Sequence, residues 1–110
     1  MGAAPVISSN SLAGTATLIQ GAVLNLVAVR AINTTGAAAF VQLFDLALAA
    51  DVTLGTTVPT WVVTSAASAT SEDDGIPGDG LIFRNGLVAA STTTPTGSTA
   101  ATQHVKFVIV

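Results

Sequence analysis

The chain contains no cysteine and unusually few charged residues. Charged side chains make up 8% of its 110 residues and apolar ones 50%, whereas an ordinary soluble domain carries about 25% charged residues. The absence of cysteine excludes disulfides, thiolate metal ligands and a cysteine nucleophile. With so few charges to keep an isolated molecule in solution, the composition favours a surface largely covered by other copies. A stable monomer with a Thr/Ser-rich face is the alternative.

Basic residues are equally scarce. Only Arg30, Arg84 and Lys106 are cationic, and the formal net charge is −3. Binding to a phosphate backbone requires clustered Lys and Arg that release counterions. We therefore expect no nucleic-acid partner.

Long hydrophobic runs are missing too, although the mean hydropathy is +0.71. A membrane-spanning helix needs about 20 apolar residues in succession, and the best run, residues 21–32, is interrupted by Asn25 and Arg30. The N-terminus has no basic segment typical of a signal peptide, and Val6 stands where a myristoylation motif has Ser or Thr. We expect a soluble, untargeted chain with no membrane partner.

The residues for catalysis are also few. His104 is the only histidine and there is no cysteine, so a standard zinc site cannot be assembled. No Gly-x-Ser-x-Gly nucleophile motif, Gly-x-Gly-x-x-Gly motif or Walker motif occurs. We expect a non-enzymatic protein without catalytic residues or cofactors, in which His104 is a solvated or interface side chain.

One acidic cluster is present, and it lies in a glycine-containing segment. Oxygen ligands in such a loop suit calcium, although their order does not match an EF-hand. We nevertheless interpret the segment as a solvated loop tip, with a calcium site as the alternative. The candidate ligands are Glu72, Asp73, Asp74 and Asp79.

The body of the chain consists of short apolar segments separated by turn residues, a pattern typical of an antiparallel β-sandwich or barrel. Residues 18–32 predict a long strand with a break or bulge at Gly21, and residues 40–45 predict its return strand in a hairpin. Residues 46–50 favour one or two helical turns. A strand apolar on both faces must be covered on both faces.

The second half continues this pattern. Residues 58–64 predict a strand around Trp61, which we interpret as a core residue, with an interface anchor as the alternative. Residues 65–80 predict a polar loop. Asn85-Gly86 between two apolar runs predicts a hairpin. In the last strand Val105, Phe107 and Ile109 alternate with His104 and Lys106.

We divide the chain into an extended N-terminal arm, residues 1–17, and a single β-sandwich domain, residues 18–110. The arm is small and polar apart from one apolar cluster, and it is suited to pairing with the sheet edge of a neighbouring molecule. Apolar residues also continue the outer side of the last strand. The candidate interface residues are therefore Pro5, Val6, Ile7, Val108 and Val110.

Several short motifs resemble a family of small structural domains from tailed phages. This family has an "LYD…A…P..GT..P" segment and a later "F..GL..A.T" segment. Here Phe44 stands where the family has Tyr, Ala47 falls in the small-residue stretch, and residues 52–54 replace the proline expected before Gly-Thr. The matching segments, which lie between Gly21 and Val110, are residues 40–45, 54–59, 83–87 and 91–93.

The resemblance implies a jelly-roll-like β-sandwich found on virions and brings no catalytic residues with it. Together with the low charge, it leads us to expect a virion structural protein. The leading hypothesis is a capsid decoration (cement) subunit on the capsid exterior. Its partners would be copies of itself, as a trimer or dimer, and the major capsid protein. A phage tail or fibre module, or a carbohydrate-binding module, is the alternative.

We expect the acidic segment to be a solvated loop tip. Calcium added to the purified chain should then release no heat in titration calorimetry and should leave the melting temperature unchanged. Heat of binding together with a raised melting temperature would instead identify a calcium site.

Overall fold

The computed structural model describes residues 6–72 and 76–110, with the backbone alone for residues 6–10 and 69–72. Over this range the chain forms nine strands and one turn of 3-10 helix, and every strand pair is antiparallel. The elements are β1 (Val6–Leu12), β2 (Thr17–Gln20), β3 (Leu24–Asn33), β4 (Ala39–Phe44), η1 (Ala49–Asp51), β5 (Trp61–Ser65), β6 (Ala69–Glu72), β7 (Leu81–Phe83), β8 (Leu87–Thr92) and β9 (Gln103–Ile109).

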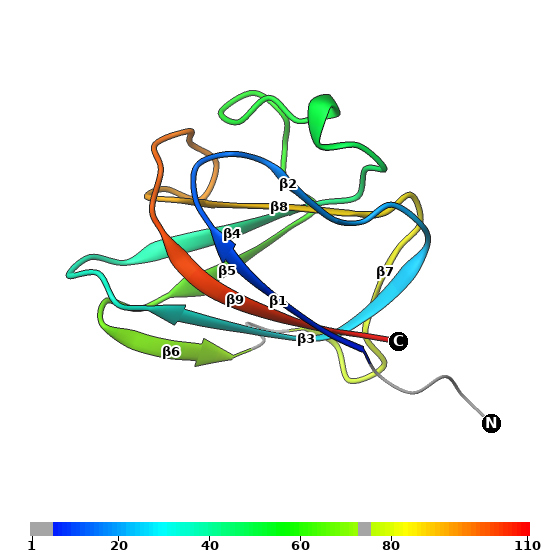
Figure 1. The fold of residues 1–110 in the computed structure, drawn as a ribbon, viewed down its shortest axis with the longest axis horizontal. Helices are drawn as coiled ribbons and strands as arrows, with labels where there is room; N and C mark the ends of the chain where they lie inside the picture. Colours follow the sequence, from blue (N-terminus) through cyan, green and yellow to red (C-terminus); the bar gives the residue numbers. More distant parts are fainter. Residues whose placement is uncertain (1–5, 73–75) are drawn as a thin grey trace.

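The strands form two sheets. One has the order β1-β9-β3-β6, with β7 also paired to β3, and the other has the order β2-β8-β4-β5. We call them the β9 sheet and the β8 sheet. β6 pairs with the end of β3 at residues 30–33, and β7 pairs with its start at residues 24–26. Figure 1 shows β9 and β3 side by side in one layer and β8 and β4 in the other.

The pairing is nested along the chain. β1 pairs with β9, β2 with β8, β3 with β6 and β7, and β4 with β5. The nested pairs form one long antiparallel ribbon, which is folded over into two layers. Two further pairs, β3–β9 and β4–β8, join adjacent segments of this ribbon within each sheet. This is the jelly-roll arrangement of an antiparallel β-sandwich, so the expected fold class is confirmed.

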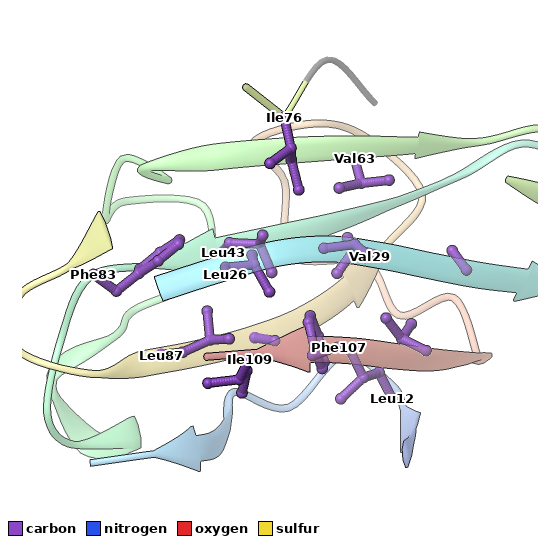
Figure 2. Close-up of a cluster of buried hydrophobic side chains, with 14 of the residues drawn as sticks. Leu12, Leu26, Val29, Leu43, Val63, Ile76, Phe83, Leu87, Phe107 and Ile109 are labelled. Carbon is purple, nitrogen blue, oxygen red and sulfur yellow. The ribbon is translucent and has the colours of Figure 1, made fainter. Parts of the chain in front are cut away.

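The core lies between the two sheets and follows the alternation of the strands. In β9, Val105, Phe107 and Ile109 are buried, whereas His104 and Lys106 are exposed, as the sequence predicted. Figure 2 shows Phe107 and Ile109 between Leu26 of the adjacent strand β3 and Leu87 of β8 in the facing sheet. Burying such a side chain contributes about 1.5–3 kcal/mol, so the sheets are held together mainly by apolar contact.

One buried polar network also joins the two sheets. The Ser65 hydroxyl of β5 donates to Gln103 Oε1 of β9 at 2.7 Å, and Gln103 Nε2 donates to the Ser91 hydroxyl of β8 at 2.9 Å. All three side chains are buried. A network whose members are paired fixes the relative position of the layers, because a shift would leave buried polar atoms without partners.

The outer face of the β8 sheet is covered by the chain itself. Gln42, Phe44 and Val88 alternate with core residues, yet each is at most 1% exposed. Gln42 Nε2 donates to the Gly97 carbonyl at 3.0 Å, which places the loop of residues 93–102 over this face. Figure 1 shows this loop (orange) and residues 45–60 (green) on the side of β8 remote from β3. The cover expected for strands apolar on both faces is therefore supplied here by loops of the same chain.

Neither of the two predicted hairpins forms. Residues 18–32 are split into β2 and β3, which lie in different sheets, and β4, the expected return strand, lies in the sheet opposite β3. β7 and β8 likewise belong to different sheets, so Asn85-Gly86 marks a crossing between layers. The prediction was wrong because a turn sequence between apolar runs also fits a connection across a sandwich, where both strands bury one face in the same core.

The N-terminal segment is extended from residue 6, but it does not project from the domain. Residues 6–12 form β1, which pairs with β9 of the same chain over seven residues, and Thr17 begins β2. The described sandwich therefore begins at residue 6 and not at residue 18. Two smaller features also differ from expectation: the predicted polar loop contains β6, and the helical turn lies at residues 49–51.

Gly86 provides a test of the crossing between β7 and β8. Its φ is 149°, and a Cβ at this position would lie 2.6 Å from the Gln20 carbonyl oxygen and 2.8 Å from that of Leu46. We expect Gly86→Ala to lower the free energy of unfolding by about 2–4 kcal/mol through backbone strain and overpacking, measured by chemical denaturation. Gly36→Ala is the matched control, because nothing lies within 4 Å of the Cβ it would add. An equal effect of both substitutions would contradict this account of Gly86.

Candidate interaction surface

The residues considered for catalysis and metal binding do not converge in the described part of the chain. His104 is exposed on β9, beside Lys106. No group of three or more His, Cys, Asp or Glu residues that could hold a metal ion occurs among the residues described.

The structure describes part of the acidic segment. Glu72 is the last residue of β6, and Asp73 and Asp74 lie outside the described residues. Asp79 is exposed, and its carbonyl oxygen accepts a hydrogen bond of 3.0 Å from Asn25 Nδ2. The calcium hypothesis stays a prediction.

Four of the five candidate interface residues belong to the β1–β9 side of the molecule. Pro5 lies outside the described residues. Val6 and Ile7 begin β1, where their backbones stand opposite Ile109 and Val108. Val108 is half-buried and Val110 is 43% exposed. Residues from the two ends of the sequence thus meet on one sheet.

The outer face of the β9 sheet carries an apolar strip. Ile82 of β7 stands opposite Asn25 of β3, and the Asn25 backbone exchanges hydrogen bonds of 3.1 and 2.9 Å with Val110. Ala28 of β3 stands opposite Val108 of β9. Cross-strand partners share a face, so four apolar side chains lie on this face, outside the core, with Asn25 between Ile82 and Val110. We define the apolar strip as Ala28, Ile82, Val108 and Val110.

The same face becomes cationic toward its other end. Arg30 stands opposite Lys106, and Ile32 stands opposite His104. All three polar residues are exposed. Two of the three cationic residues of the chain and its single histidine therefore flank the apolar strip. An apolar centre with a polar rim is typical of a protein–protein interface.

The strip extends beyond the residues that the sequence identified. Val108 and Val110 were predicted from the alternation of the last strand. Ala28 and Ile82 were missed, although Ile82 is 51% exposed. The only sequence signal was an apolar residue between Leu81 and Phe83, and a run apolar throughout does not show which residue faces outward.

The β8 side has exposed apolar residues of a different kind. Leu18 belongs to β2, and Leu48 and Val58 lie on the segment between β4 and β5. They are 42%, 57% and 82% exposed. They sit on an edge strand and a covering loop rather than on an open sheet face, and single exposed apolar residues are common on protein surfaces.

Trp61 is half-buried and packs against the core cluster. This supports its interpretation as a core residue. Its buried Nε1 has no hydrogen-bond partner among the described residues. The four phenylalanines are also buried or half-buried, so no aromatic ring of the chain lies fully exposed.

Comparison with known proteins does not indicate a function for this surface. Comparison of the chain with protein-family models, with curated proteins and with solved structures found no match. Within the described residues, no helix has the length and apolar character needed to span a membrane.

The apolar strip should be dispensable for folding. Ile82→Ala removes an exposed side chain and should change the free energy of unfolding by at most about 0.5 kcal/mol. Phe83→Ala, one residue further on, empties a fully buried site and should cost about 3–5 kcal/mol. Chemical denaturation of the two variants measures both values. A large loss for Ile82→Ala would show that the strip serves the fold of the single molecule.

Proposed function

We propose that this chain is a virion structural protein, a capsid decoration subunit that sits on the exterior of a phage head and bridges capsid proteins. The observation that carries the proposal is the unequal covering of the two sheets. Loops of the chain cover the outer face of the β8 sheet, whereas in the described part of the chain the apolar strip on the β9 sheet keeps Ile82 and Val110 exposed, beside Arg30, Lys106 and His104.

The chemistry of the strip suits attachment to a repeating lattice. A few apolar side chains bury too little area for a strong contact by themselves, because stable interfaces bury about 800 Å² per partner. On a shell with many identical sites, weak contacts made by linked copies add through avidity. A non-enzymatic subunit with a small apolar strip is suited to such a role.

The jelly-roll topology and the resemblance to small tailed-phage domains support the same proposal. The carbohydrate-binding alternative receives less support, because sugar sites use exposed aromatic rings and those of this chain are buried or half-buried. The proposed partners are the major capsid protein and other copies of the chain, and the proposed location is the head rather than the tail.

Co-sedimentation with tailless heads that lack the protein tests this function. We expect saturable binding of the purified chain to such heads. Ile82→Asp should reduce the binding at least tenfold, since a carboxylate in a desolvated apolar contact costs more than about 1.4 kcal/mol. Val58→Asp is the matched control, because Val58 is even more exposed but lies on the loop segment beyond β4, and it should bind normally.

Two results would contradict the proposal. One is sedimentation with isolated tails or fibres but not with heads. The other is equal binding of the Ile82→Asp and Val58→Asp variants, which would remove the apolar strip from the contact.

A further inference from the structure

The sheet edges point to how copies of the chain contact one another. Among the described residues, the β9 sheet ends in β1 on one side and in β6 and β7 on the other, and the β8 sheet ends in β2 and β5. An edge strand has backbone N–H and C=O groups without partners in its own sheet, and these groups can pair with a strand of another molecule. Proteins that avoid such pairing shorten, bend, charge or otherwise protect their edges.

Every other edge of the described structure is shorter than β1. β2 has four residues, and its pairing is irregular between Leu18 and Gln20. β6 has four residues and ends at the acidic Glu72, and β7 has three. β5 has five residues. Short, bulged or charged edges are poor templates for strand addition.

β1 differs from these edges, although Pro5 directly precedes it. It is seven residues long, contains no charged residue and no proline, and pairs with β9 without a register shift. Its sequence, VISSNSL, mixes β-branched and small polar residues. It is the longest and most regular edge of the described structure, and it is electrically neutral along its whole length.

We propose that β1 of one copy pairs antiparallel with β1 of a second copy, about a two-fold axis. The inference rests on the proposed function, because it names the contact between copies of the same subunit. A two-fold contact uses the same surface on both partners, and antiparallel pairing of a strand with itself provides such a contact. Because β1 is uncharged, the pairing brings no like charges together.

The geometry links this pairing to the apolar strip. The two-fold axis of an antiparallel strand pair runs perpendicular to the sheet, so the two β9 sheets become one continuous sheet. Their outer faces then point to the same side. β9, which carries Val108, is the strand next to β1. The strips of both copies therefore face the shell together, and one dimer presents twice the apolar area of a single chain.

Charge substitutions at the centre of β1 test the pairing. Ser9 is the middle residue of β1, and in a centred antiparallel pair it stands opposite Ser9 of the second copy. Ser9→Lys and Ser9→Asp each place like charges opposite one another and should raise the dimer Kd about fivefold or more. An equimolar mixture of the two variants places opposite charges there and should restore the Kd to the wild-type value or below it.

Analytical ultracentrifugation of the purified chain measures these constants against the monomer mass of 10.8 kDa. Thr34→Lys and Thr34→Asp are the matched controls, because Thr34 is exposed in the turn between β3 and β4, and both variants should dimerise as the wild type does. Thermal melting of the Ser9 variants verifies that they fold. Recovery on mixing cannot arise from a folding defect, which both variants would keep.

Two results would overturn the inference: a wild-type chain that stays monomeric up to about 1 mM, or a dimer whose Kd is the same in both Ser9 variants and in their mixture. The outcome is separable from that of the proposed function. A monomeric chain that still sediments with heads overturns the β1 pairing alone. A β1-paired dimer that does not sediment with heads supports the pairing and overturns the decoration role.

Discussion

The outer face of the β8 sheet is buried at Gln42, Phe44 and Val88 as fully as the inner face is, so the fold covers this sheet on both sides. The other sheet covers the inner face, and the loops of residues 45–60 and 93–102 cover the outer one, where Gln42 Nε2 donates to the Gly97 carbonyl. These loops lie on the β8 side, and among the described residues no loop is shown to cover the apolar strip on the outer face of the β9 sheet. The position of the apolar strip, and the surface available to a partner, follow from this distribution of cover.

The nested pairing of the strands decides what that open face contains. Because β1 pairs with β9 and β9 with β3, the last strand of the chain lies inside the sheet, between two other strands. Val108 is thus brought next to Ala28, and Val110 onto the same face as Ile82, although these residues are far apart in sequence. The Ser65–Gln103–Ser91 network fixes the layers at the other end of β9. Apolar contact supplies most of the stability, and this buried network sets the register of the layers.

Part of the interaction surface was predictable and part was not. Val108 and Val110 were found because the last strand alternates in the sequence between residues that face the core and residues that face outward. Ile82 was missed because it lies in a short run, Leu81-Ile82-Phe83, that is apolar at every position. Ala28 was missed because it lies in a long apolar segment, and the register shift between Leu26 and Ala28 disturbs the alternation at that point. Without alternation, only the three-dimensional structure shows which side chain is outside.

By itself, the sequence determined the class of the fold, the two-residue pattern of β9 and the scarcity of charge, since these depend on residue type and on local periodicity. The partner of each strand was decided by the tertiary structure. The turn after residue 32 and the Asn85-Gly86 pair connect strands in opposite sheets, and residues 6–12 pair with β9 of their own chain. Local sequence encodes where the chain turns. Which strand the next segment pairs with depends on a distant strand that has a complementary apolar face and free backbone groups. That is a property of the whole folded chain.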